Sequence, residues 1–397
     1  MATFDAIVLG GGTMGTAAAW ALAKRGATTL VLEQFAHVHR LGAHGGRTRV
    51  IRHAYAESPE YVPIVQRADD LWLELEREAG NRVLHRTGGV ELSAPGYGHA
   101  RAARRSAELH GLPHEWISPA EVNRRWPAMS VPEDWDALYS PQVGFLETEA
   151  SLRALATVAR RRGATIHEGE PVRGWQADSS GVTVATNAAT YRADSLIVTA
   201  GAWTGGLLGE LGLPLTLLRK VLWWLRVDDP APFSVGRFPV FIADSAAGEI
   251  YGFPIHDHPG LKIADHRGGS PTTVETIDRT VRDDEERGVV AGAQQLFRGV
   301  TDRVLESLVC HYTMTPDADF VVDRHPTRPN VTIGAGFSGH GFKFATAIGE
   351  MLADLALDAS VEPVPRLALA RLAALSSPQV TDTGVPIARG SGLRALR

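Results

Sequence analysis

Residues 5–15, Asp-Ala-Ile-Val-Leu-Gly-Gly-Gly-Thr-Met-Gly, decide the fold of this chain. The run from Asp5 to Leu9 is short and apolar, which is typical of a buried parallel strand. Gly10, Gly12 and Gly15 then give the pattern G-x-G-x-x-G, and the next segment, TAAAWALAKRG, is rich in helix-forming residues. The run therefore predicts a strand, a tight turn and a helix whose N-terminus faces a bound phosphate group.

An acidic residue stands where this pattern needs one. A second strand is predicted from Thr28 to Leu32, and Glu33 closes it, 23 residues after Gly10. A lone glycine pattern is weak evidence, because any tight turn between a strand and a helix can use glycines, but here strand, helix, second strand and acid follow in order. We predict a dinucleotide site with Thr13 and Met14 in its turn. Glu33 favours a free ribose 2′-hydroxyl, and hence FAD or NAD rather than NADP.

The composition is that of a globular enzyme. The chain has 397 residues, enough for two domains, and is 44% apolar and 21% charged. Its single cysteine excludes an intrachain disulfide and fits a reducing compartment, so we expect a cytoplasmic protein. The net charge of −5 gives no reason to expect a nucleic-acid partner, and no apolar stretch is long enough to span a membrane. The first strand begins within five residues of Met1, so we expect no signal peptide.

Periodic patterns predict the remaining elements. Helices are expected at 60–79, 101–109, 147–162 and 346–357, and strands at 90–93, 165–167, 172–176, 182–186, 195–199, 320–323 and 331–335. The strand at 195–199 is apolar and runs into the small turn Ala200-Gly201, so we expect it in the same domain as the first strand. Residues 214–314 are β-rich. We therefore predict a discontinuous nucleotide domain with a β-rich domain inserted into it, and a poorly ordered tail after Ser376.

Several unusual motifs stand in a fixed order along the chain. They are VLGGGTMG at 8–15, TRVIRHAY at 48–55, YVP at 61–63, RWP at 125–127, TAGAW at 199–203, YGFP at 251–254, LKIADH at 261–266, VCHYT at 309–313 and GFSGHGFKF at 336–344. In these motifs the chain resembles the family of monomeric sarcosine oxidase and N-methyltryptophan oxidase, within the D-amino-acid-oxidase-like flavoproteins. The resemblance implies an α/β fold with a discontinuous Rossmann-like FAD-binding domain at 1–84, 142–212 and 317–397, and a β-rich substrate domain at 85–141 and 213–316.

The only cysteine, Cys310, lies in the motif VCHYT. Taken alone, it could be an ordinary buried cysteine that packs as a small hydrophobic residue. The resemblance implies instead that Cys310 attaches FAD through a thioether to the flavin 8α carbon. It also implies that the enzyme reduces O₂ to hydrogen peroxide.

Two arginines and a lysine are candidate partners of a substrate carboxylate. Arg49 and Arg52 lie three residues apart, and either could pair with a local acid or offer a guanidinium to a carboxylate. Lys343 stands in an otherwise small and apolar motif, where a charge is costly to bury unless it meets an anion. The resemblance implies that Arg52 and Lys343 hold the substrate carboxylate and that Arg49 lies on the other face of the flavin.

Four further residues are candidates for the chemistry. Lys262 lies in an apolar strand, where a lysine is most often on the exposed face. The resemblance implies instead that Lys262 lies over the flavin and activates O₂, since a fixed cation stabilises superoxide. His266 is a candidate for polarising the substrate amine or tuning the site. The alternative is that His266 is a loop histidine whose ring bonds a backbone carbonyl. Tyr251 and Tyr312 are candidate substrate-facing hydroxyls, or else core tyrosines.

One segment departs from the family. The run before TRVIRHAY is close to GSHHGD in the family, whereas here residues 42–47 read GAHGGR, so that Gly45 and Arg47 replace a histidine and an aspartate. This segment is expected near the flavin, so the pocket or the flavin attachment could differ. Ile242, Trp223 and Trp224 are expected in the pocket-lining domain, but the sequence does not say which of them point inward. The resemblance assigns these further residues to the cofactor: His44, Val172, Gly201, Gly339, Gly341 and Phe342, together with Lys343.

These observations predict an FAD-dependent oxidase of a small secondary or N-methylated amino acid, with O₂ as the second substrate. We expect a monomer with no membrane or nucleic-acid partner. We expect no metal, because the closest histidine pair, His256 and His258, lies outside any established ligand pattern. Two alternatives stay open: a dehydrogenase that passes electrons to a carrier, and a biosynthetic enzyme or flavin-binding protein for a cyclic imino acid or a carrier-bound amine.

Overall fold

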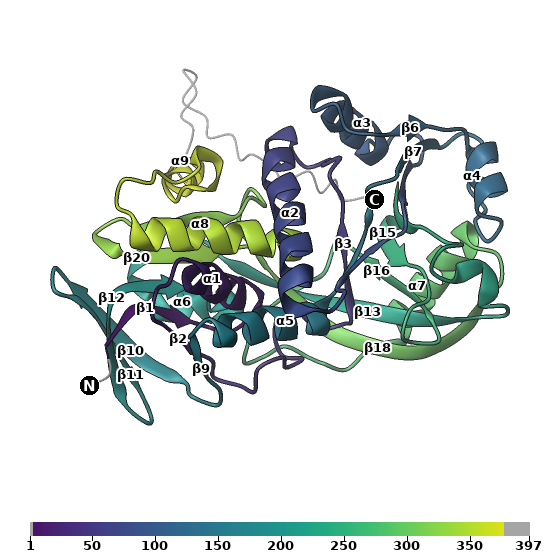
Figure 1. The fold of residues 1–397 in the computed structure, drawn as a ribbon. Helices are drawn as coiled ribbons and strands as arrows, with labels where there is room; N and C mark the ends of the chain where they lie inside the picture. Colours follow the sequence, from purple (N-terminus) through teal and green to yellow (C-terminus); the bar gives the residue numbers. More distant parts are fainter. Residues whose placement is uncertain (1–2, 377–397) are drawn as a thin grey trace, which may run out of the picture.

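Two large β-sheets organise the structure, a computed structural model that describes residues 3–376 (Figure 1). The first sheet has the path β10-β11-β12-β1-β2-β9, with β20 beside β12 and β19 beside β20. Its strands are β1 (Thr3–Leu9), β2 (Thr29–Leu32), β9 (Thr165–His167), β10 (Val172–Asp178), β11 (Gly181–Thr186), β12 (Thr190–Val198), β19 (Val321–His325) and β20 (Arg328–Ala335). β1 pairs in parallel with β2 and with β12, which confirms that the apolar strand near 195–199 belongs beside the first strand.

Three helices lie together beside this sheet, and Figure 1 shows them side by side. They are α1 (Thr13–Lys24), α5 (Thr148–Arg161) and α8 (Ala345–Leu357), and α1 contacts both of the others. Small residues allow the close approach, since a Cβ at Gly349 would lie 2.5 Å from the carbonyl carbon of Ala17. The long helix α2 (Val62–Ala79) packs across α5 and α8 and ends at Gly80, which has a left-handed conformation.

The second sheet has nine strands and is mostly antiparallel. Its path is β17-β13-β16-β15-β14-β5-β7-β6, and β18 also pairs with β13. Its strands are β5 (Gly89–Ser93), β6 (Glu115–Trp116), β7 (Asp136–Ser140), β13 (Thr216–Val227), β14 (Val240–Ser245), β15 (Gly248–Phe253), β16 (Leu261–Asp265), β17 (Ser270–Thr272) and β18 (Val300–Met314). This sheet accounts for the β-rich pattern of residues 214–314.

Alternation along these strands gives the second sheet two different faces. Trp223, Ile250 and Ile263 belong to a buried apolar cluster that also includes residues of α7 (Asp283–Leu296). Their neighbours Trp224 and Lys262 point to the opposite face, where the functional residues described below gather. The sequence therefore separates a packing face from a chemical face within the same strands.

Helix α7 was not anticipated, because residues 214–314 were interpreted only as β-rich. Its first turn carries Asp283, Asp284, Glu285 and Glu286, which interact favourably with the positive end of a helix. Glu285 also accepts a hydrogen bond from the backbone N–H of Arg282, as in a capping box. This start signal was present in the sequence.

A small sheet connects the parts that carry the arginines. β3 (Thr48–Ile51) and β4 (Leu84–Arg86) both pair with β8 (Gly144–Glu147). β3 also contacts the 3₁₀ turn Phe342–Phe344, so the segment of Arg49 and Arg52 lies near Lys343 although the two are far apart in the sequence. The remaining helices are α3 (His99–Leu109), α4 (Pro119–Arg125), α6 (Thr204–Leu207) and α9 (Ala370–Ser376).

The predicted α/β fold class is confirmed, and the predicted helices and strands recur with shifts of a few residues at their ends. The exact domain boundaries stay a prediction. The tail after Ser376 lies outside the described residues. Within residues 3–376, none of the helices is both long enough and apolar enough to cross a lipid bilayer.

Candidate active site

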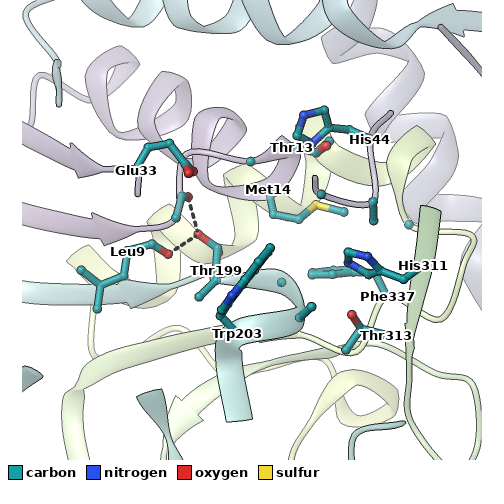
Figure 2. Close-up of a pocket in the computed structure, with 18 of the residues that line it drawn as sticks. Leu9, Thr13, Met14, Glu33, His44, Thr199, Trp203, His311, Thr313 and Phe337 are labelled. Atoms are coloured by element: carbon teal, nitrogen blue, oxygen red, sulfur yellow. Dashed lines mark hydrogen bonds between the residues drawn. The ribbon is translucent and has the colours of Figure 1, made fainter. Parts of the chain in front are cut away.

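A cavity of about 350 Å³ opens where β1, β2 and β12 of the first sheet end. Figure 2 shows it with Glu33 toward one end and His44 and His311 toward the other. Of the residues predicted to bind the cofactor, these line the cavity: Gly10, Gly12, Thr13, Met14, Glu33, His44, Val172, Gly201, Gly339, Gly341 and Phe342. Segments that are distant in the sequence therefore meet around one elongated space.

The three fingerprint glycines have different roles. Gly10 has a φ of +94°, and a Cβ at Gly15 would lie 1.9 Å from the carbonyl oxygen of Gly10, so both positions serve the tight turn. A Cβ at Gly12 would meet nothing within 4 Å, and Gly12 lines the cavity just before the first residue of α1. The open side of Gly12 leaves room for a phosphate group at the N-terminus of the helix.

Glu33 lies at the wall of the cavity with its carboxylate largely buried. It accepts hydrogen bonds from the backbone N–H groups of Gly11 at 2.8 Å and Phe35 at 2.9 Å. Burial raises the pKa of Glu33, and these backbone bonds partly offset the effect. The carboxylate is thus fixed at the cavity wall by two backbone N–H groups.

His44 offers an unpaired polar atom to this cavity. Its Nε2 is buried without a hydrogen-bond partner, and burial lowers the pKa of His44 to about 3, so the ring is neutral. A buried polar atom without a partner is costly in a finished structure. The unpaired nitrogen therefore fits a cavity that is built to receive a polar ligand.

A second, smaller cavity adjoins the first. Arg49, Gly339 and Phe342 line both cavities. The smaller one is also lined by Arg52, Tyr251, His266 and Lys343, all of which were predicted to contact the substrate, and by Val50, Glu57, Ile242, Glu249 and His340. The predicted cofactor residues and the predicted substrate residues therefore surround two connected spaces.

Arg52 is already paired within this cavity. Its Nη2 donates to both carboxylate oxygens of Glu57, at 2.7 and 2.6 Å, and its Nη1 donates to the carbonyl of Ala54 at 3.1 Å. Burial alone would lower the pKa of Arg52, but Glu57 and other nearby groups together raise it by more than burial lowers it. The guanidinium therefore stays charged. The alternative interpretation, that one of the arginines pairs with a local acid, is correct for Arg52.

Lys343 is buried, and its ammonium group has more N–H donors than it uses. Its Nζ donates one hydrogen bond, to the carbonyl of His340 at 2.7 Å, and its exposed fraction is 6%. Burial, together with the charge of Arg52, lowers the pKa of Lys343 to about 7. An anion in the small cavity would use the remaining N–H groups and stabilise the charged form.

Lys262 does not lie on an exposed strand face. It is 3% exposed, and its Nζ donates to the carbonyls of Gly46 at 2.5 Å and Thr48 at 2.7 Å and to the Thr48 hydroxyl at 3.0 Å. Burial and the nearby Arg49 lower the pKa of Lys262 well below its usual value. Arg49 donates to carbonyls of the same segment, so two cations are fixed to residues 43–48.

Cys310 is buried on the same sheet face but lines neither cavity. It packs with Leu222, Trp224 and Ala264, while the next residues, His311 and Tyr312, line the large cavity. Burial raises the pKa of the thiol, and the surrounding cations Arg49, Lys262, Lys220 and Arg279 oppose that shift. The thiol thus lies one residue before the cavity wall, and burial outweighs the cations in setting its pKa.

The segment that departs from the family packs directly over this region. Gly46 has a φ of +96°, and a Cβ there would lie 2.2 Å from Leu222, so the position requires glycine. Arg47 pairs with Glu306 and Asp257, and its guanidinium carbon lies 5.9 Å from the ring centroid of Trp224. The altered residues therefore hold the loop whose carbonyls bind Lys262.

The aromatic candidates have different positions. Tyr312 lines the large cavity, and its ring centroid lies 5.5 Å from that of His266, which lines the small one. Burial lowers the pKa of His266, so its ring is neutral at physiological pH. Of the residues left undecided by the sequence, Ile242 lines the small cavity, Trp224 packs against Cys310 and Trp223 belongs to the opposite, apolar face.

Several site residues were not anticipated. Glu57 and Glu249 line the small cavity, and Trp203, His311 and Phe337 line the large one. Glu249 could have been found, because it lies two residues before Tyr251 in a strand and so shares its face. His340 lies inside a quoted motif, but nothing in the sequence indicates that it bonds the hydroxyl of Tyr55.

A histidine pair meets a carboxylate outside the two cavities. His85 and His256 each lie within hydrogen-bond distance of Oε1 of Glu147, at 2.6 and 2.9 Å. His258, the histidine closest to His256 in the sequence, pairs with Glu306 instead. The ligand atoms of His85, Glu147 and His256 all lie within 4.8 Å of one another.

Comparison with known proteins identifies the class of protein. Residues 5–355 match the family of FAD dependent oxidoreductases designated DAO, and the chain belongs to this family. It is 40% identical over 360 residues to the monomeric sarcosine oxidase of Streptomyces avermitilis, covering 89% of this chain and 94% of that relative. It is 34% identical over 360 residues to the N-methyl-L-tryptophan oxidase of Yersinia pestis, covering 89% and 95%. The family resemblance inferred from the motifs is confirmed.

Solved structures share the fold. NikD, described as an unusual amino acid oxidase essential for nikkomycin biosynthesis, superposes with a TM-score of 0.82 at 24% identity, covering 93% of this chain and 98% of that chain. The L-proline dehydrogenase of P. horikoshii superposes with a TM-score of 0.78 at 23% identity, with the same coverage. At these identities the likeness establishes the fold and nothing further.

Proposed function

We propose that this chain is an FAD-dependent oxidase of a small secondary or N-methylated amino acid, of the sarcosine or N-methyltryptophan kind. The products would be an imine, which hydrolyses to an aldehyde and an amine, and hydrogen peroxide. The junction of the two cavities carries this proposal, since Arg49, Gly339 and Phe342 line both. A cofactor in the large cavity would adjoin the small one, where Arg52 and Lys343 offer positive charge to a carboxylate. The names of the relatives support the same substrate class.

The residues of the large cavity fit FAD. The open side of Gly12 and the N-terminus of α1 would hold the diphosphate, and Glu33 would hold a ribose. When bound, FAD supplies the acceptor for the two electrons that leave the carbon–nitrogen bond. We further propose a thioether between Cys310 and the flavin 8α carbon. The cations around Cys310 support this link, because they oppose the rise that burial causes in the pKa of the thiol. Replacing one hydrogen of the 8α methyl group by sulfur is a two-electron oxidation, for which the flavin itself and then O₂ would be the electron acceptors.

The small cavity would orient the amino acid. Lys343 would meet the carboxylate with its unused N–H groups, and Arg52 would join it after release from Glu57. His266 is neutral and does not repel a positively charged amine. Tyr251 and Tyr312 complete the wall. We propose that Lys262 assists the reduction of O₂, because Gly46 and Thr48 fix its Nζ on the sheet face that also carries Trp224 and Cys310.

This function can be tested by assaying the purified enzyme with sarcosine, N-methyltryptophan, proline and simple N-methylamines. Oxygen uptake and peroxide release should match one another and should require both the carboxylate and a secondary amine. Turnover that needs an artificial electron carrier and releases no peroxide would instead make the protein a dehydrogenase. Turnover restricted to proline or another cyclic imino acid would favour the biosynthetic alternative.

A further inference from the structure

The small cavity contains a carboxylate that binding of the amino acid backbone does not use. Glu249 lies on β15, two residues before Tyr251, and therefore on the same face of the sheet. Its side chain is 20% exposed, and its Oε1 lies 3.4 Å from Nδ1 of His99. The carboxylate of Glu249 thus faces the cavity with one oxygen toward His99.

A second carboxylate stands behind it. His99 Nε2 lies 2.7 Å from Oε2 of Glu91, while Oε1 of Glu91 is buried without any hydrogen-bond partner. Glu91 is 2% exposed and lies opposite Ile242 in the sheet, and Ile242 lies opposite Tyr251. Because Ile242 and Tyr251 both line the small cavity, Glu91 stands on the same face of the sheet.

This group has two carboxyl groups but a single cation. Burial lowers the pKa of His99, but its hydrogen bonds to Glu249 and Glu91 raise the pKa to about 10, so His99 is an imidazolium at neutral pH. The pKa of Glu249 is about 2, since His99 outweighs the effect of burial, and Glu249 is ionised. One imidazolium is thus shared between the carboxyl groups of Glu249 and Glu91. Arg52 does not balance the second carboxyl group, because Arg52 already forms an ion pair with Glu57.

Enclosing the negative charge of Glu249 in a site that is closed by substrate costs free energy. A substrate with a neutral side chain would cover Glu249 without replacing the water that it loses, which costs free energy. A cationic group would pair with the same carboxylate and remove that cost. The cavity therefore has two distinct recognition elements: Lys343 and Arg52 for a carboxylate, and Glu249 for a positive charge.

We propose that the preferred substrate is a secondary or N-methylated amino acid whose side chain carries an ammonium or guanidinium group, and that this group pairs with Glu249. The proposal rests on the proposed function, because it assigns the end of the amino acid that Arg52 and Lys343 do not hold. In the opposing interpretation, Glu249, His99 and Glu91 only fasten α3 to the second sheet.

Three substrates with the same number of side-chain carbon atoms separate these interpretations: Nα-methyl-ornithine, Nα-methyl-norvaline and Nα-methyl-glutamate, which end in a cation, a methyl group and an anion. The measurement is the rate and substrate dependence of anaerobic flavin reduction in the holoenzyme. Nα-methyl-ornithine should exceed Nα-methyl-norvaline by about tenfold to hundredfold in apparent second-order rate, the range for a partly buried charge pair. Nα-methyl-glutamate should be the poorest of the three.

Two variants of Glu249 sharpen the test. Glu249→Gln should abolish the preference for Nα-methyl-ornithine over Nα-methyl-norvaline, by lowering the rate with the first and raising the rate with the second, because no charge is then left to desolvate. Glu249→Lys should reverse the preference toward Nα-methyl-glutamate. Glu210→Gln, which removes a carboxylate that pairs with Arg328 far from the cavity, is the matched control and should keep the wild-type preference. Thermal denaturation gives a readout without turnover: 5-aminopentanoate should stabilise the wild type more than pentanoate, and Glu249→Gln should abolish the difference.

The outcomes are distinct. Equal rates with the cationic and neutral substrates in the wild type would overturn the proposal while leaving the oxidase function intact. A uniform loss with all three substrates in Glu249→Gln would also overturn it, because that result assigns Glu249 a structural role only. If none of the three substrates reduces the flavin while sarcosine or N-methyltryptophan does, this inference fails alone; if those two fail as well, the proposed function fails with it.

Discussion

Arg52 and Glu57 form a two-pronged ion pair, with Nη2 of the arginine 2.7 and 2.6 Å from the carboxylate oxygens. The cation proposed to hold the substrate carboxylate is therefore neutralised by a neighbour five residues along the chain. A substrate must compete with Glu57 before Arg52 can bind it. The affinity of this site is thus set by an exchange of partners, not by the charge of Arg52 alone.

This exchange gives the first prediction. Arg52→Ala should weaken binding of a competitive carboxylate inhibitor by about 2–5 kcal/mol, the cost of removing one side of a buried charge pair. Glu57→Gln should strengthen it by roughly 1.5–3 kcal/mol, because the guanidinium no longer has to leave a charged partner. A flavin-absorbance titration measures both, and the double variant should show no gain over Arg52→Ala. Weaker binding in Glu57→Gln would contradict the exchange.

Lys343 gives a pH dependence with a defined sign. Its pKa is lowered from 10.5 to about 7, so the amine is charged below pH 7 and neutral above it. A bound carboxylate favours the charged form, and binding above pH 7 therefore takes up a proton. Inhibitor affinity should fall by up to about tenfold per pH unit as pH rises from 7 to 9. Lys343→Met should bind more weakly at pH 6 and lose this slope; an unchanged slope would assign the titration to another group.

The attachment of the flavin can be tested on denatured protein. Protein precipitated with acid should stay yellow, because the proposed thioether to Cys310 survives unfolding. Cys310→Ala should release its flavin into the supernatant under the same conditions, while its thermal unfolding shows that it still folds. If the wild-type supernatant carries all of the flavin, the covalent link does not exist.

Lys262 should govern the reaction with oxygen. Lys262→Met should slow reoxidation of the reduced flavin by orders of magnitude, equivalent to about 3–4 kcal/mol of lost charge stabilisation. Anaerobic reduction by substrate should change much less. Lys24 is a suitable control, because it pairs with Glu74 and lines neither cavity, so Lys24→Met removes a lysine without changing the proposed oxygen site. Equal reoxidation rates in wild type and Lys262→Met, measured by stopped flow, would dismiss the role.

Much of the fold was predictable because its signals are local. The glycine run, Glu33 and the apolar strand near 195–199 are set by short-range patterns, and the structure has them in the predicted sheet. Helix α7 was missed because two glycines, Gly288 and Gly292, dilute its helical pattern, although its acidic first turn marks its start.

The site was less accessible from the sequence, because its contacts join distant segments. Lys262 depends on the carbonyls of Gly46 and Thr48, more than two hundred residues away, so its burial could not be derived from its own strand. The pairing of Arg52 with Glu57 is local, but nothing in the sequence separates that partner from a substrate carboxylate. The role of Glu249 appears only when the sheet aligns it with Tyr251 and brings His99 beside it.

Anaerobic mixing of the flavin-loaded enzyme with a matched pair of amines tests the central claim most directly. Sarcosine carries the carboxylate, and N-methylethylamine is a secondary amine of similar size without it. We predict that sarcosine, or a longer N-methylated amino acid, bleaches the oxidised flavin within the enzyme's turnover time, that the amine does not, and that admitting air restores the colour with release of hydrogen peroxide. Equal bleaching by both compounds, or no bleaching by any N-methylated amino acid, would contradict the account.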